Sequence, residues 1–305
     1  MKRFITHTFL ALGVAVISLF SQYSSPAAEP LPAGGQVLLA KYSALKTELE
    51  NNQFGIPLSL ESREDSDSLY VDVYGIYAYP FNSVIDAFKT PDNLCDMSTL
   101  LMNVKAATFQ KVSEEWQLTL YNGRKYYQSP NDAFKMDFSF HVTALQPEYF
   151  NIQLTGNNGP LGIKDQRANL EAIPLDKATT FIHFRYDYSF GLLVRAATTS
   201  YYATIGSDKK GFSVIATDKT GDPVYVNGAR GSLERNAVRA YFAIQTYMDA
   251  LEIPDKQRFE KRINGYYDLT LQFKKQLYEM DKGEYLAIKR REHTNQLMLQ
   301  KNLVN

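Results

Sequence analysis

Apolar and polar residues alternate along much of the middle of the chain, which is the pattern of half-buried β-strands. In the clearest run, an apolar residue stands at every second position from Phe134 to Ala144. Short turns such as Asn122-Gly123 and Gln146-Pro147 separate neighbouring runs, so we expect an antiparallel meander. Six further runs are predicted strands: Leu69–Tyr79, Met102–Gln110, Glu115–Tyr121, Tyr149–Thr155, Asp165–Ile173 and Thr179–Ser189.

Helical periodicity marks both ends of the chain and one long segment after the strands. Gln36–Asn52 is a predicted amphipathic helix, and Gly231-Ser232 is expected to cap the longest clean helix, Leu233–Leu251. Two more predicted helices, Lys256–Met280 and Lys282–Leu299, mix apolar with many charged residues. After the first long strand, the string YPFNSVIDAFKTPDNLCDMS predicts two short helices.

This order of elements resembles the helix-grip fold of the START-like superfamily (SRPBCC, including polyketide cyclase-like proteins). The string quoted above is the most specific part, because two small helices follow the first strand in that fold. The resemblance implies an α+β protein in which a curved antiparallel sheet grips a long C-terminal helix. The other predicted helices are then extra N- and C-terminal elements. It also implies a cavity between sheet and helix, and the binding of lipids, sterols or polyketides. Some members of the superfamily are cyclases or hydrolases.

The first residues have the pattern of a bacterial secretory signal peptide. Met1-Lys2-Arg3 is basic, an uninterrupted apolar stretch runs from Phe9 to Phe20, and small residues follow at Pro26-Ala27-Ala28. An uncleaved membrane anchor is the alternative, although the apolar stretch is shorter than the roughly 20 residues of a spanning helix. We therefore expect export across the inner membrane and a periplasmic location. The expected organisation is a signal peptide at 1–28, a linker, helix and short strand at 29–68, a START-like ligand-binding domain at 69–251 and a C-terminal helical extension at 252–305.

The charge balance argues against a nucleic-acid partner. The chain has 33 basic and 33 acidic residues, and removing the signal peptide takes away only Lys2 and Arg3 among them. The mature protein would then carry a net charge near −2, which provides no broad positive field. A basic run, Lys289-Arg290-Arg291, leaves open a transient contact with a membrane surface, against the plainer interpretation of a solvated helix face.

The sequence contains no recognisable catalytic, metal-binding or cofactor-binding motif, so we expect no catalytic residue, metal or cofactor. The single cysteine, Cys95, excludes an internal disulfide and is expected to be buried. His183 shares a strand face with Arg185 and Asp187, which indicates either a small polar site or a solvated outer face.

Aromatic and aliphatic side chains on one face of the sheet, together with those of the gripping helix, are the predicted cavity lining. Ordinary core packing is the alternative for the same residues. The predicted lining is Phe138, Phe140, Phe150, Ile152, Phe184, Tyr186, Tyr188, Tyr241, Ile244 and Met248.

Three functions are compatible with these observations. The first is a periplasmic protein that binds or carries a hydrophobic small molecule or lipid in the cavity. The second is a cyclase- or hydrolase-like enzyme that uses Tyr186, His183 or Arg185 in the same pocket. His183 and Tyr186 are three positions apart and would point to opposite faces of a regular strand, which counts against the enzyme. The third is a non-catalytic interaction module that acts through its terminal helices.

Overall fold

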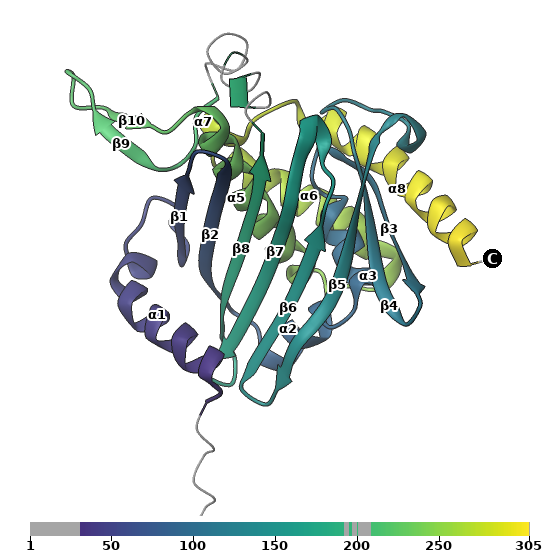
Figure 1. The fold of residues 1–305 in the computed structure, drawn as a ribbon, viewed down its shortest axis with the longest axis horizontal. Coiled ribbons are helices and arrows are strands. Elements are labelled where there is room, and N and C mark those ends of the chain that lie inside the picture. The colour runs from purple at the N-terminus through teal and green to yellow at the C-terminus, as the bar shows by residue number, and fades with distance from the viewer. Residues whose placement is uncertain (1–30, 192–194, 197–199, 201–208, 305) are drawn as a thin grey trace, which may run out of the picture. The chain divides into compact units, whose positions relative to one another are not determined.

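The computed structural model describes residues 31–191, 195–196, 200 and 209–304, so the expected signal peptide lies outside the described residues. The chain from Leu31 to Asn305 forms one compact unit. Its centre is an eight-stranded antiparallel sheet with the strand order β1-β2-β8-β7-β6-β5-β4-β3 (Figure 1). These strands are β1 (Leu58–Glu64), β2 (Ser68–Tyr77), β3 (Val104–Val112), β4 (Glu115–Asn122), β5 (Phe134–Gln146), β6 (Tyr149–Gly156), β7 (Ile163–Pro174) and β8 (Thr180–Phe190).

The topology is that of the helix-grip fold, as the sequence predicted. Two short helices follow β2, the strands β3 to β8 then form a meander, and β8 returns to pair with β2. A small hairpin of β9 (Val214–Thr217) and β10 (Pro223–Tyr225) projects beside β1 (Figure 1). The helices are α1 (Ala33–Glu50), α2 (Phe81–Phe88), α3 (Pro91–Ser98), α5 (Gly228–Asp249), α6 (Asp255–Leu271), α7 (Lys274–Leu277) and α8 (Lys282–Val304).

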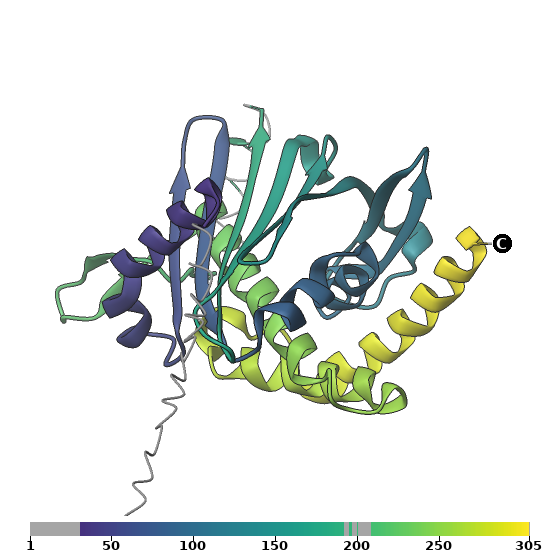
Figure 2. The same cartoon turned by 90° about the horizontal axis from the view of Figure 1, so that it is seen from below.

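Helices cover both faces of the sheet (Figure 2). The face toward α5, α2 and α3 is called the inner face, and the opposite face, on which α1 lies, is called the outer face. The main core fills the space between the inner face and α5. A smaller cluster, which includes Leu38, Leu45, Tyr74 and Phe181, seals α1 against the outer face. Phe181 is completely buried in this cluster. The outer face of β8, which also carries His183 and Arg185, is therefore not simply a solvated face.

The gripping helix α5 begins at Gly228, so the expected cap at Gly231-Ser232 was wrong. Gly231 lies in the first turn of α5, where Gly211 and Val226, at the base of the β9–β10 hairpin, approach the helix backbone. A Cβ atom at position 231 would be 2.8 Å from the carbonyl oxygen of Val226 and 3.1 Å from the backbone nitrogen of Gly211. Glycine is therefore required by this close backbone approach rather than by a helix end.

Two connections in the sheet are notable, and the second differs from the expectation. The tight turn joins β3 to β4 at Ser113 and Glu114, whose φ angles are 49° and 71°. Positive φ at both central residues is the geometry of a type I′ hairpin, although neither residue is Asn or Gly. The predicted short turn at Asn122-Gly123 instead opens a longer connection, residues 123–133, which contains the 3₁₀ helix Pro130–Asp132.

The predicted helix Lys256–Met280 is interrupted. The chain leaves the helix at Phe273, whose ring lies 5.5 Å from that of Phe242 and 5.8 Å from that of Phe54. Directing this ring into the aromatic core breaks the helix into α6 and α7.

Candidate functional site

Paired residues of neighbouring antiparallel strands share a face of the sheet, so the register defines the composition of the inner face. It is apolar along successive rows. One row across five strands is Phe140, Leu154, Ala168, Tyr186 and Val71. The next row is Val142, Ile152, Leu170, Phe184 and Val73.

Where α5 crosses β2, the space between helix and sheet is filled completely. A Cβ atom at Gly75 would be 2.4 Å from the ring of Tyr241, so the helix side chain rests directly on the strand backbone. The ring of Tyr77 lies 4.9 Å from that of Tyr241, and its hydroxyl donates a hydrogen bond to the Tyr241 carbonyl oxygen at 3.1 Å. Both tyrosines are almost inaccessible to solvent, which makes this region solid core rather than cavity.

Over β6, β7 and β8 the inner face is more open. Leu154, Ala168, Phe184, Tyr186 and Tyr188 are all only partly buried, although they point toward the interior of the fold. We call these five residues the β6–β8 patch. The rings of Tyr186 and Tyr188 lie 5.7 Å apart and tilted, so they present aromatic surface side by side. This patch is where the inner face can meet an additional apolar group.

A polar group is fixed at the edge of the patch. The Tyr186 hydroxyl donates to Oε1 of Gln166 at 2.7 Å, and Nε2 of the buried Gln166 donates to the carbonyl oxygen of Asn158 at 2.6 Å. Burial raises the pKa of Tyr186 well above its usual range, so the hydroxyl keeps its proton at physiological pH. It can orient a ligand by hydrogen bonding but is a poor general base.

The predicted lining residues divide between open and solid regions. Phe184, Tyr186 and Tyr188 belong to the β6–β8 patch. Phe140, Phe150, Ile152, Tyr241, Ile244 and Met248 are buried in the main core, and Phe138 lies in a separate cluster with Cys95 and Met136.

Sequence reasoning missed Ala168 as a site residue. A small residue in a weakly alternating run gives no hydrophobic signal, and only its register opposite Tyr186 reveals it. Cys95, which was expected to be a buried small hydrophobe, is 3% exposed. Burial raises the pKa of its thiol far above the usual range, so the reactive thiolate is suppressed.

On the outer face, His183 is held between two carboxylates. Its Nδ1 lies 3.0 Å from Oε2 of Glu171, and its Nε2 lies 2.7 Å from Oδ1 of Asp72. The imidazole also stacks on Tyr74, with ring centroids 4.4 Å apart. Burial alone would lower the pKa of His183, but the hydrogen bonds to Asp72 and Glu171 outweigh it and raise the pKa above its usual value.

This arrangement weakens the enzymatic alternative. Both ring nitrogens of His183 are engaged, which leaves neither available as a general base. Arg185 shares the outer face and pairs with Asp187 at 3.2 Å, whereas Tyr186 points to the inner face. The three groups considered for acid–base chemistry therefore lie on opposite sides of the sheet.

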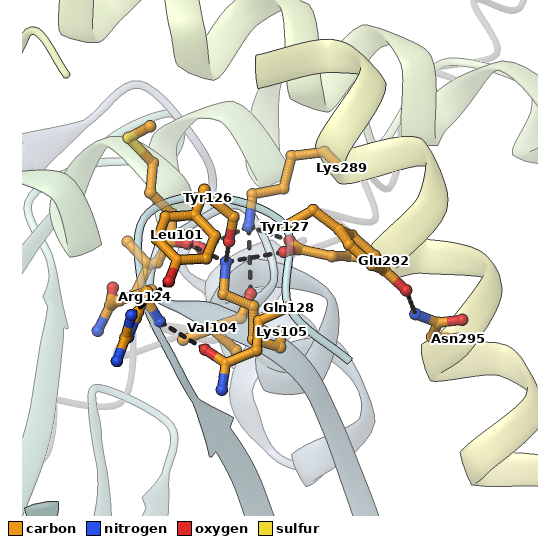
Figure 3. A network of polar contacts seen from close by, with 12 residues as sticks. Leu101, Val104, Lys105, Arg124, Tyr126, Tyr127, Gln128, Lys289, Glu292 and Asn295 are labelled. Atoms are coloured by element: carbon orange, nitrogen blue, oxygen red, sulfur yellow. Dashed lines mark hydrogen bonds and ion pairs between the residues drawn. The ribbon is translucent and has the colours of Figure 1, made fainter. Parts of the chain in front are cut away.

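The most unusual polar cluster joins α8 to the edge strand β3 (Figure 3). Glu292 lies between two lysines, with Oε1 at 2.8 Å from Nζ of Lys105 and Oε2 at 2.7 Å from Nζ of Lys289. Both charges of the Lys105–Glu292 pair are completely buried, and Lys289 is nearly so. Each ammonium also donates to two backbone carbonyl oxygens, those of Met102 and Tyr126 from Lys105 and those of Leu101 and Val104 from Lys289.

Farther along α8, two glutamine side chains bond to the β3 backbone. Gln296 Oε1 accepts from the Ala107 amide at 3.0 Å, and Gln300 Oε1 accepts from the Phe109 amide at 2.9 Å. Gln300 Nε2 also donates to the Phe109 carbonyl oxygen at 2.8 Å. The spacing of the two glutamines along α8 matches the spacing of Ala107 and Phe109 along β3, because four helical residues and two strand residues each advance roughly 6 Å. The helix thus protects an edge strand that would otherwise present free backbone groups.

Two of the three residues of the basic run Lys289–Arg291 form ion pairs within the fold. Lys289 is buried, and Arg290 forms a two-bond pair with Glu260 at 2.8 and 2.9 Å. The guanidinium of Arg291 lies 3.5 Å from the ring centroid of Tyr127. The interpretation of this run as a plain solvated face was wrong for Lys289, because the Glu292 carboxylate draws that side chain inward.

Other features of the described chain add little chemistry. A groove of about 330 Å³ opens between the end of α1 and the start of β1, away from the inner face. Its lining includes Tyr42, Lys46, Asn52 and Ile76. Within the described residues, no group of three His, Cys, Asp or Glu side chains could hold a metal ion. None of the helices described there has the length and apolar character needed to span a membrane.

Comparison with models of known protein families gave no match, and comparison with curated protein sequences gave none. The fold itself is similar to that of several solved structures. Norcoclaurine synthase from Thalictrum flavum is 10% identical, with 47% of this chain and 83% of that chain covered and a TM-score of 0.33. Human StAR-related lipid transfer protein 5 is 11% identical, with coverages of 55% and 88% and a TM-score of 0.32. The Zhui aromatase/cyclase from Streptomyces sp. R1128 is 8% identical, with coverages of 66% and 94% and a TM-score of 0.32.

The strand order, the two helices after β2 and the position of α5 give this protein a helix-grip fold. At these identities the comparisons concern the fold alone, and the function must be argued from the residues of this chain.

Proposed function

We propose that this protein is an exported carrier or sensor that binds a hydrophobic small molecule or lipid over the β6–β8 patch. The observation that supports this proposal is the partial exposure of Phe184, Tyr186 and Tyr188 on a face where neighbouring side chains, Phe140, Ile152 and Leu170, are buried in the core. Apolar surface that faces inward but stays in contact with water is unfavourable by about 25 cal/mol per Å². A bound apolar ligand would recover that free energy.

The polar group beside the patch supports a ligand with one hydrogen-bonding end. Ligand sites are typically apolar with a few fixed polar groups, and the Tyr186–Gln166 pair matches that description. The same pair is unsuited to acid–base catalysis because the pKa of Tyr186 is raised by burial. Binding and release therefore fit the patch better than a cyclase or hydrolase reaction.

Export belongs to the proposal as well. The N-terminal basic residues, apolar stretch and small residues support cleavage near Ala28, and the compact unit starts only at Leu31. Cell fractionation together with the intact mass of the purified protein tests this part. A mature chain that starts near Glu29 in the periplasmic fraction is expected, and a full-length chain in the cytosol would contradict it.

Native mass spectrometry with organic extraction tests the ligand. Protein purified from its own cells should carry a hydrophobic molecule in near-stoichiometric amount. An apo mass, combined with no binding from a total-lipid extract, would overturn the carrier proposal.

A pair of adjacent substitutions localises the site. Ala168→Phe places a ring in the β6–β8 patch and should weaken ligand binding by roughly tenfold or more, because the ring would cover the apolar surface on which the ligand is proposed to lie. Asn169→Phe adds a ring at the next position, on the outer face of the same strand, and should leave binding unchanged. Thermal unfolding of both variants checks that they are folded. Equal loss in the two variants would place the ligand elsewhere.

A further inference from the structure

From Lys289 onward, helix α8 has an inverted distribution of polarity. Its inward stripe, which contacts β3, consists of Lys289, Glu292, Gln296 and Gln300. Its outward side exposes Leu297 and Met298, which are 57% and 54% accessible. Single exposed apolar residues are common, but a helix with a polar inner stripe and apolar outer residues is not the usual amphipathic design.

The same outward side is basic. After Glu284, the only acidic residue of α8 is Glu292, which is completely buried. Arg291 and Lys301 flank the apolar residues at helical spacing, and among the described residues neither has an acidic partner in an ion pair. The last turns of α8 lie at the periphery of the unit (Figures 1 and 2).

We propose that the outward side of the C-terminal half of α8 docks on an anionic lipid surface. Leu297 and Met298 would enter the headgroup region while Arg291 and Lys301 meet the negative surface, as interfacial amphipathic helices do. A second copy of the chain fits this surface less well, because a two-fold contact would bring the same cations together with no exposed acid in the C-terminal half of the helix to balance them.

Another exposed apolar surface lacks this charge complementarity. The β9–β10 hairpin exposes Val214 and Ile215 to a similar degree, 54% and 55%, but its tip carries Asp218 and Asp222 against a single lysine, Lys219. The hairpin therefore provides a matched control. The docking proposal does not depend on occupancy of the β6–β8 patch.

Vesicle co-sedimentation tests the proposal with residues 29–305, so that the N-terminal apolar stretch cannot contribute. The probes are phosphatidylcholine vesicles, with and without about 30% phosphatidylglycerol. Binding should require the anionic lipid and fall as salt is raised. Leu297→Glu combined with Met298→Glu should weaken binding by at least roughly tenfold, and Lys301→Gln alone by about fivefold. Val214→Glu combined with Ile215→Glu should have no effect.

Three results would overturn the proposal. These are absence of binding to the anionic vesicles, equal binding to neutral vesicles, and equal sensitivity to the α8 and hairpin substitutions. Light scattering after size exclusion adds a fourth. If the native protein is a dimer that Leu297→Glu with Met298→Glu converts to a monomer, a second copy covers this surface. Far-UV circular dichroism verifies that each variant keeps its helix content.

Discussion

The sheet is held by two long helices that use opposite kinds of contact. Helix α5 packs on the inner face with aromatic and aliphatic groups, and Tyr241 lies against the backbone of Gly75. Helix α8 packs on the edge strand β3 with Lys289, Glu292 and two glutamines, all bonded to backbone or to one another. The α5 contact is mainly apolar, with a few hydrogen bonds such as that from Tyr77 to the Tyr241 carbonyl oxygen, whereas the α8 contact with β3 consists mainly of directional bonds.

The two contacts should therefore respond differently to substitution. Apolar packing is non-directional, so its loss scales with the volume removed or inserted. A buried ion network contributes little net stability when complete, but it is costly when one partner is lost, because an unpaired charge remains in a low-dielectric site.

The largest effect is expected at Glu292. Glu292→Gln removes the only negative charge between Lys105 and Lys289, and should lower the free energy of unfolding by about 3–5 kcal/mol. Lys289→Met leaves the balanced Lys105–Glu292 pair in place and should cost only about 1–3 kcal/mol, mainly from the unbonded carbonyl groups. Urea unfolding at pH 7 compares the two variants. A larger loss in Lys289→Met would show that the backbone bonds, and not the charge balance, hold α8.

At the α5 contact, the corresponding test is Gly75→Val. The added atoms would collide with the Tyr241 ring, and we expect a loss of about 3 kcal/mol from overpacking. Gly191→Val is the control, because no atom lies within 4 Å of its expected Cβ position. Thermal and urea unfolding should separate the two variants clearly. Similar small losses would mean that α5 can move away from the strand.

The fold was largely predictable because its main contacts are apolar. The alternation in β5 and β8 and the periodicity of α5 directly reflect which side chains are buried. The order of strands and helices then restricted the topology to one known arrangement. The resemblance could not show which part of the inner face is solid, because that depends on contacts such as Tyr241 on Gly75, which join residues distant in sequence.

The α8 contact could not be found by the same reasoning. A search for apolar periodicity overlooks a helix whose buried stripe is polar, and the basic run at Lys289 looks like a solvated surface. The available signal was the spacing of Lys289, Glu292, Gln296 and Gln300, which places four polar side chains on one helix face. Similarly, His183 was recognised as part of a polar face, but its bonds to Asp72 and Glu171 come from two other strands.

Burial lowers the pKa of Lys289 to about 8, and the nearby Glu292 carboxylate only partly offsets this. In the unfolded chain the pKa of a lysine is about 10.4, so above pH 8 the unfolded state binds more protons than the native state. This lysine should therefore make the protein more stable as pH rises, by about 2 kcal/mol between pH 8 and pH 9.5. Urea unfolding of the wild type across this range should show the gain, and Lys289→Met should lack it. The same pH dependence in both proteins would assign the titration to another group.

The smallest effects are expected at the glutamines, where the α8 contact reaches the end of its buried stripe. Gln296→Leu leaves the Ala107 amide buried without an acceptor and should cost about 1–3 kcal/mol. Gln300→Leu should cost about 1 kcal/mol or less, because Gln300 is only partly buried and water can replace its bonds to Phe109. Hydrogen exchange of the two amides measures each bond separately: Ala107 should lose protection in the first variant and Phe109 in the second. If neither amide exchanges faster, the glutamines do not protect the β3 edge, and the buried ion network alone anchors α8.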